Sequence, residues 1–181
     1  DLVNATQGLF TSSTFEYSPP ALGSDLRFVK YLFQQQYFRP LGSGLVFATN
    51  GRLGLATAFG QELIPSERFF AGGGNSVRGY ADSSLGPTDF LGPSGGSAML
   101  VLNEELRFPI VGIIRGVGFF DAGNVFPGVA DLSLTGLDTA TGFGVRINTP
   151  FALLRVDYGI PLVRTPGMPF GRWFFSIGQA F

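Results

Sequence analysis

The side chains that could carry chemistry in this chain of 181 residues are carboxylates and guanidinium groups. The chain has 13 acidic and 12 basic residues, of which only Lys30 is a lysine, and it contains neither histidine nor cysteine. A Ser-His-Asp triad, a thiolate nucleophile and a thiolate metal site are therefore excluded. We predict a protein that is not an enzyme and that needs no metal and no cofactor.

A run of glycines surrounds one arginine in the segment 71–80, which reads Ala-Gly-Gly-Gly-Asn-Ser-Val-Arg-Gly-Tyr. A phosphate-binding loop would need Lys-Ser or Lys-Thr after its last glycine, but Tyr80 follows Gly79. The net charge of −1 and the single lysine also argue against nucleic acid as a partner, because nucleic-acid binding needs a basic face. We expect ion pairing by Arg78 to be the chemistry of this segment.

Composition restricts the fold class. The chain is 45% hydrophobic and 14% aromatic, and 14% of its residues are charged, whereas a typical soluble domain has about 25% charged residues. No stretch approaches the roughly 18 consecutive apolar residues of a membrane-spanning helix. An apolar chain with 27 glycines and no such helix favours a membrane β-barrel.

Alternating apolar and polar residues predict strands, most clearly after residue 140. In Ala152–Pro161, Leu154 and Val156 share one face while Arg155 and Asp157 share the other, because residues i and i+2 point to the same side of a strand. A soluble sandwich and a membrane barrel both produce this pattern. Aromatic residues near the strand ends favour the barrel, where they form interfacial girdles. They are Tyr17, Tyr37, Tyr158, Trp173 and Phe181.

The whole chain, residues 1–181, is predicted to be one domain: an all-β, antiparallel transmembrane β-barrel of about eight strands. Tight turns at Pro40–Gly44, Pro109–Gly112 and Thr149–Pro150 alternate with longer loops, as in outer-membrane barrels. The connection Glu62–Ser97 is about three times the usual length and is therefore expected to be functional. The expected strands are Gly8–Ser18, Leu26–Arg39, Leu45–Phe59, Ala98–Phe108, Ile114–Asn124, Thr139–Asn148, Ala152–Pro161 and Arg172–Phe181.

Four motifs and the final residues point to a family. The long connection contains Val77-Arg78-Gly79-Tyr80. Glu104-Glu105-Leu106-Arg107-Phe108-Pro109, Phe119-Phe120-Asp121-Ala122-Gly123-Asn124-Val125-Phe126 and Arg155-Val156-Asp157-Tyr158-Gly159-Ile160-Pro161-Leu162 follow in order, and the chain ends in Phe175-Ser176-Ile177-Gly178-Gln179-Ala180-Phe181. Together they resemble the BamA/TamA-type superfamily of outer-membrane assembly and secretion barrels.

Members of that superfamily usually have sixteen strands and N-terminal periplasmic POTRA modules. This chain resembles the C-terminal half of the barrel alone, without POTRA modules. Three alternatives remain open: the chain is a fragment, it closes as an eight-stranded barrel, or it pairs with a second chain as a homodimer.

The resemblance implies that the long loop folds into the lumen and that Arg78 docks on acidic residues of the inner wall. Strand parity agrees, because Asp121 shares its face with Arg115 and Gly123, and Glu105 shares its face with Arg107. In the alternative, Arg78 lies in a solvated loop and Asp121 pairs with Arg115. The predicted site comprises the loop motif Val77, Arg78, Gly79 and Tyr80 and the lumenal partners Glu105, Asp121 and Gly123.

Several arginines also fall on the inner face by parity. A ring of arginines could form an ion-selective pore, or it could form a packed salt network with Glu105, Asp121 and Asp157. We favour the network, because the interior of a small barrel is filled by side chains. The arginines are Arg52, Arg107, Arg115, Arg146, Arg155 and Arg172.

The resemblance also implies a location and a role. Trp173, Phe175, Ile177 and Phe181 match the C-terminal insertion signal of outer-membrane barrels, here that of a Gram-negative type of bacterium. The expected role is insertion of outer-membrane proteins or protein translocation, with outer-membrane lipids and client outer-membrane proteins as partners. The alternative is a short structural or pore-forming barrel that retains the motifs. The weakly patterned first strand is expected to form a weak seam with the last strand.

Overall fold

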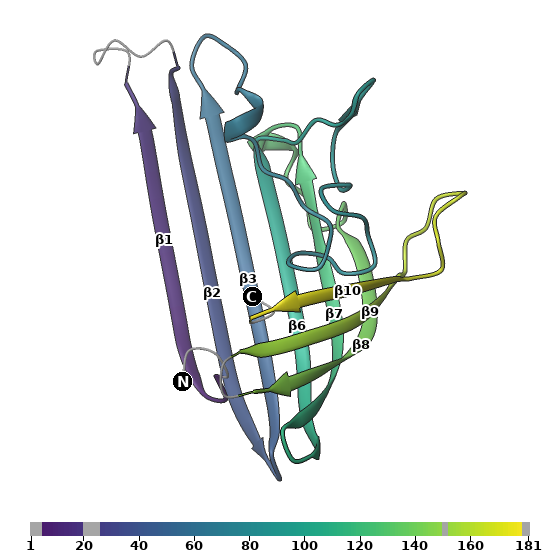
Figure 1. The fold of residues 1–181 in the computed structure, drawn as a ribbon. Helices are drawn as coiled ribbons and strands as arrows, with labels where there is room; N and C mark the ends of the chain where they lie inside the picture. The colour runs from purple at the N-terminus through teal and green to yellow at the C-terminus, as the bar shows by residue number, and fades with distance from the viewer. Residues whose placement is uncertain (1–4, 20–25, 150–151, 179–181) are drawn as a thin grey trace.

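The computed structural model describes residues 5–19, 26–149 and 152–178. Eight strands form one antiparallel sheet in the order β1-β2-β3-β6-β7-β8-β9-β10 (Figure 1). In the described residues, no helix is long and apolar enough to cross a membrane. The strands are β1 (Gly8–Ser18), β2 (Phe28–Gly42), β3 (Leu45–Ala58), β6 (Ala98–Val111), β7 (Ile114–Phe126), β8 (Asp138–Asn148), β9 (Leu153–Pro161) and β10 (Arg172–Ile177).

The all-β antiparallel class and the eight strands predicted from the sequence are confirmed. Two of the predicted turns begin too early, because β2 continues through Pro40 and β6 continues through Pro109. Both prolines lie where the strand register shifts, between Pro40 and Gly42 and between Pro109 and Val111. Pro40 still pairs with Val46 and Pro109 with Arg115, and the next residues, Leu41 and Ile110, are left out of the register. Strands tolerate proline at such irregular positions.

Long and short connections leave opposite ends of the sheet, as expected. The end that carries the long connections is called the loop rim here. The segment 59–97 leaves it and contains the 3₁₀ turn η2 (Pro65–Glu67) and a small hairpin of β4 (Thr88–Asp89) with β5 (Gly92–Pro93). A second 3₁₀ turn, η3 (Val129–Asp131), lies between β7 and β8. Of the predicted Thr149–Pro150 turn, Pro150 lies outside the described residues.

The sheet is strongly curled, and the long loop lies on its concave side. Figure 1 shows β8, β9 and β10 turned across the front of the longer strands, with the loop between the two parts. The curl gives most strands a buried inner face and an exposed outer face. In β6, for example, Val101 and Glu105 are buried while Leu102 and Leu106 are exposed.

The predicted closure into an eight-stranded barrel is not present among the described strands. In the described part of the chain, β1 pairs only with β2 and β10 pairs only with β9, so these residues do not form the expected seam between the first and last strands. An eight-stranded barrel has an interior just wide enough for side chains. Here the concave side also holds a loop segment with its own backbone, which needs a wider curve.

One carboxylate, Glu104, lies on the outer face at the middle of β6. Glu104 is flanked along the strand by Leu102 and Leu106 and lies opposite Phe120 of β7. Its Oε1 accepts a hydrogen bond from the Thr49 hydroxyl at 2.7 Å, while its Oε2 is buried without a hydrogen-bond partner. A buried polar atom without a partner destabilises the fold by about 1–3 kcal/mol.

Replacing this carboxylate should therefore stabilise the protein. We expect Glu104→Leu to raise the free energy of unfolding by about 1 kcal/mol or more, measured by urea unfolding in lipid vesicles. Thr49→Val should have the opposite effect, because it removes the hydroxyl donor from Glu104. The double variant should recover the stability of Glu104→Leu, and a double variant no more stable than Thr49→Val would contradict this account.

Candidate functional site

Apolar contacts hold the long loop on the inner face of the sheet. Val77, Tyr80 and Leu85 belong to one buried cluster with Val101 of β6 and Val125 of β7. Two isolated bridges, Phe69 with Gly96 and Ala71 with Leu85, join the outgoing and returning arms of the loop. These contacts bring the segment 72–80 to the inner face of the sheet.

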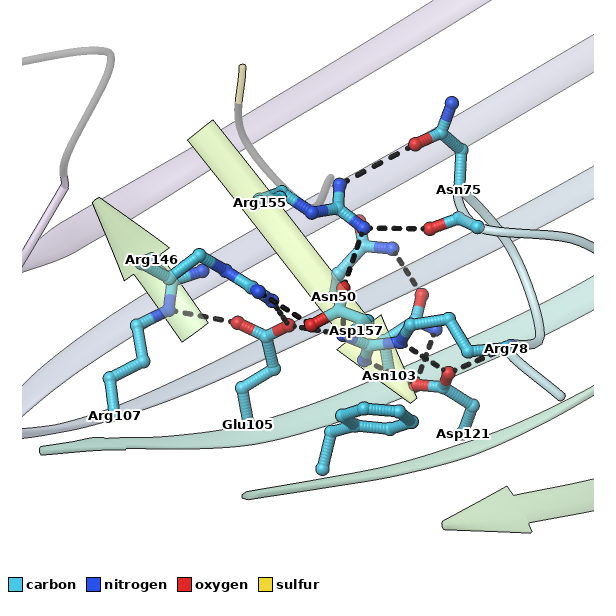
Figure 2. A network of polar contacts seen from close by, with 12 residues as sticks. Asn50, Asn75, Arg78, Asn103, Glu105, Arg107, Asp121, Arg146, Arg155 and Asp157 are labelled. Atoms are coloured by element: carbon cyan, nitrogen blue, oxygen red, sulfur yellow. Dashed lines mark hydrogen bonds and ion pairs between the residues drawn. The ribbon is translucent and has the colours of Figure 1, made fainter. Parts of the chain in front are cut away.

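Arg78 is the centre of the polar contacts (Figure 2). Its Nε and Nη2 donate to the two oxygens of Asp121, each at 2.7 Å, and its backbone N–H donates to Asp121 Oδ2 at 3.0 Å. Its Nη1 donates to Glu105 at 2.6 Å and to Asp157 at 3.5 Å. One guanidinium group therefore joins carboxylates from β6, β7 and β9, and the fork on Asp121 is bidentate.

The Arg78 side chain is 2% exposed, so its charge is balanced by these carboxylates rather than by water. Burial alone would lower the pKa of Arg78, but the hydrogen bonds and negative charge of Asp121, with the charge of Glu105, raise it above its usual value. Its guanidinium carbon also lies 3.5 Å from the ring centroid of Phe119. This is a cation–π contact that covers one face of the group.

Glu105 and Asp157 each bind further arginines of the sheet. Glu105 accepts from Arg107 Nε at 2.9 Å and from Arg146 Nη2 at 3.1 Å. Asp157 accepts from Arg146 Nη1 at 2.5 Å and from Arg155 Nη2 at 3.1 Å. Arg146 therefore bridges the two acids, and the contacts form one network across β6, β7, β8 and β9 (Figure 2).

The tip of the loop is held from two sides of the sheet. Arg52 of β3 donates to the backbone oxygen of Asn75, and Arg155 of β9 donates to the backbone oxygen of Gly74 at 2.8 Å. Asn103 of β6 donates to the backbone oxygen of Ser76 at 2.6 Å and to Asp121 at 2.9 Å. The loop thus connects strands that are not neighbours in the sheet.

Three glycines make the close approach of the loop possible. Gly79 has a φ of +100°, and it lies so close to Gly159 that a Cβ on Gly159 would overlap its backbone. Gly123 leaves space for Val77, since a Cβ there would lie 2.9 Å from Val77 Cγ2. A side chain at Gly159 or Gly123 would collide with the loop, and glycine tolerates the positive φ at position 79.

Tyr80 fixes the returning arm of the loop. Its hydroxyl group lies within hydrogen-bonding distance of two backbone oxygens, Val163 at 2.8 Å and Thr139 at 3.1 Å. Burial, together with the negative charge of Asp138, raises the pKa of Tyr80 to about 12. The phenol therefore remains protonated, and able to donate, at neutral pH.

These contacts decide between the alternatives left open by the sequence. Arg78 is buried on Glu105 and Asp121 rather than solvated, and Asp121 is bound by Arg78, with no ion pair to Arg115 among the described residues. Arg107, Arg146 and Arg155 form a packed salt network, whereas Arg115 and Arg172 make no ion pair within the described part of the chain.

Some contributors were not singled out from the sequence. The ring of Phe119 and the amides of Asn50 and Asn103 all contact the network; Asn50 donates to Asn103 at 2.9 Å. The period-two pattern does place Phe119 on the inner face beside Asp121. It carries no signal that an aromatic ring there would stack on Arg78.

The C-terminal residues lie apart from this network. Trp173, Phe175 and Ile177 are on the outer face of β10 and are 59%, 74% and 75% exposed. The Trp173 ring lies 4.8 Å from that of Tyr158, between centroids. Phe181 lies outside the described residues. Among those described, no group of three or more acidic side chains is placed to hold a metal ion.

Comparison with known proteins gives the family. The Omp85 superfamily domain matches residues 1–181. The chain belongs to the Omp85 superfamily. Among relatives of this Omp85 chain are the outer membrane protein assembly factor BamA of Nitratidesulfovibrio vulgaris, 31% identical over 97% of the chain, and that of Neisseria meningitidis, 28% identical over 97%.

The Omp85 chain spans about a quarter of these two relatives, 23% and 26% of their lengths. The chloroplastic outer envelope protein 80 of Arabidopsis thaliana is 34% identical over 65% of the chain and is covered to 15%. The crystal structure of BamA from Haemophilus ducreyi lacking POTRA domains 1–3 superposes with a TM-score of 0.81, at 24% identity over 99% of the chain and 40% of that structure. The sheet therefore has the fold of the matching part of the BamA barrel.

Removing the central guanidinium should destabilise the protein strongly. We expect Arg78→Ala to lower the free energy of unfolding by about 3–5 kcal/mol, because it leaves Asp121 buried without the arginine that pairs with it. Arg78→Lys keeps the charge but not the bidentate fork, so it should give an intermediate loss. Urea unfolding in lipid vesicles measures both.

The matched control for this experiment is Arg164→Ala. Arg164 is exposed in the loop before β10 and lies over the ring of Phe170. It should change the free energy of unfolding by less than about 0.5 kcal/mol. Equal stability of the Arg78→Ala and Arg164→Ala variants would refute the central role of Arg78.

The shifted pKa of Tyr80 predicts a pH dependence. The unfolded chain loses this proton near the usual tyrosine pKa of about 10, whereas the folded chain keeps it until about 12. The contribution of Tyr80 is therefore fully present below pH 10 and is lost as the pH rises toward 12. Between these values the stability of the wild type should fall faster than that of Tyr80→Phe. Parallel curves would contradict the prediction.

Proposed function

We propose that this chain is part of an outer-membrane β-barrel that assists the insertion of outer-membrane proteins or the translocation of proteins, and that it does so without chemistry of its own. The observation that carries the proposal is the match of the whole chain to the Omp85 superfamily domain. The names of its BamA relatives describe outer membrane protein assembly factors. No cofactor enters this proposal.

The loop network supports a role in which the centre of the sheet keeps its shape while the strand at its edge pairs with an incoming strand. Arg78 ties β6, β7 and β9 to one loop. By contrast, β1 has exposed side chains on both faces and an edge that pairs with no other described strand. An unpaired strand edge offers N–H and C=O groups to an incoming strand.

The proposed location is the outer membrane of a Gram-negative type of bacterium, with its lipids and client outer-membrane proteins as partners. The exposed apolar residues of the outer face support contact with lipid, since outer-membrane barrels carry an apolar band there. The two free edges of the sheet require additional strands for closure. These would come from elsewhere in a longer chain or from a second copy in a homodimer.

A reconstitution experiment tests the function. The full chain is placed in liposomes, and a urea-unfolded outer-membrane barrel protein is added as the client. Client folding is then followed by its heat-modifiable gel mobility. We expect faster client folding than in protein-free liposomes, and slower folding with Arg78→Ala than with Arg164→Ala.

Conductance across planar bilayers distinguishes the other candidate. Conductance without any acceleration of client folding would refute the proposal and support a pore-forming barrel. Native mass measurement in mild detergent distinguishes a single copy from a homodimer.

A further inference from the structure

A cavity separate from the Arg78 network lies at the loop rim, where the long loop meets β7, β8 and the start of β10. Its volume is about 420 Å³, within the range of about 300–1,000 Å³ that is usual for small-molecule sites. Leu85, Val163 and Met168 supply apolar lining, and Asp138 and Arg172 supply one charge of each sign. We call this space the rim cavity.

The acidic residue of the rim cavity, Asp138, accepts a hydrogen bond from a neutral side chain. Asp138 is the first residue of β8, and its Oδ2 accepts a hydrogen bond from the Asn124 amide at 3.2 Å. No arginine or lysine of the described residues forms an ion pair with it. A half-buried carboxylate in this position can accept further hydrogen bonds from a cation that enters the cavity.

The basic residue of the rim cavity, Arg172, has a polar atom without a partner among the described residues. Arg172 is the first residue of β10, and its Nε is buried without a hydrogen-bond partner. Within the described residues its guanidinium group forms no ion pair, either with Asp138 or with another acid. The four arginines around Glu105 and Asp157 are, in contrast, all bound to carboxylates.

Asp138 and Arg172 line the same cavity but do not pair with each other, so one ligand with two opposite charges could pair with both. Such a ligand carries an anionic group for Arg172 and an ammonium group for Asp138, joined by a short apolar linker that can contact Met168. A guanidinium group binds phosphate well because its donors match the phosphate oxygens. An ammonium group supplies three donors to a carboxylate.

We propose that the rim cavity binds a small zwitterion of the phosphate–ammonium type, with the phosphate on Arg172 and the ammonium on Asp138. Phosphoethanolamine is a small molecule with this chemistry. The same group occurs free in solution and as the headgroup of phosphatidylethanolamine. The site is independent of the proposed assembly function, because it uses none of the residues that bind Arg78.

The test is calorimetric titration of the full chain in detergent with phosphoethanolamine, inorganic phosphate and ethanolamine separately. Phosphoethanolamine should bind at least about tenfold more tightly than either single-charge probe, the factor expected from one added charge-assisted contact. Equal affinity for phosphoethanolamine and phosphate would overturn the proposal, as would no binding of phosphoethanolamine.

Matched variants assign the two charges. Asp138→Asn should make phosphoethanolamine bind no better than phosphate, and Arg172→Gln should abolish binding of both, while Arg172→Lys should retain part of it. Arg164 lies on the loop between β9 and β10 but does not line the cavity, so the Arg164→Gln variant should bind phosphoethanolamine as the wild type does. Heat-modifiable gel mobility checks that each variant is folded. Wild-type affinity in folded Arg172→Gln would overturn the proposal.

Competition distinguishes the two sources of the ligand. Vesicles containing phosphatidylethanolamine should displace phosphoethanolamine if a lipid headgroup reaches the cavity, with phosphatidylglycerol vesicles as the control. Displacement by neither vesicle assigns the site to the free molecule. Equal displacement by both vesicles would show that the ammonium group is not recognised, and this would overturn the proposal.

Discussion

A buried guanidinium group must have its charge balanced at close range, and this requirement at Arg78 determines how the loop and the sheet fit together. The three acids that contact Arg78 come from β6, β7 and β9. They can reach one point only if the sheet curls, so the curvature and the docked loop depend on each other. The loop therefore supports the wall from inside, and its removal would leave Asp121 buried without its arginine, while Glu105 and Asp157 would keep the arginines of the sheet.

Charge is shared across this network rather than divided into separate pairs. Glu105 and Asp157 each bind more than one arginine, and Arg146 bridges them. Sharing of this kind makes the effects of single substitutions non-additive. The arginines that share these carboxylates form a packed salt network rather than a ring of free charges.

The inner face, the β1 edge and the loop rim of the sheet differ in which groups they leave free to bind partners. The inner face is occupied by the chain's own loop. By contrast, β1 pairs with β2 alone among the described strands and has side chains exposed on both faces. The loop rim contains a cavity with unpaired charges. The buried ion pairs thus lie in the centre of the sheet, whereas the exposed β1 edge and the rim cavity lie at its margins, where partners and ligands can bind.

The sequence by itself determined the strands, the long loop and the inner face of Glu105 and Asp121, because the period of two assigns each strand residue to a side. It could not determine which charges meet. Arg78 is 27 residues from Glu105 and 79 from Asp157, and contacts over such separations depend on register and curl, which no local pattern encodes. The open sheet and the rim cavity were likewise decided only by tertiary structure, because a loop backbone on the concave side prevents the eight strands from closing tightly.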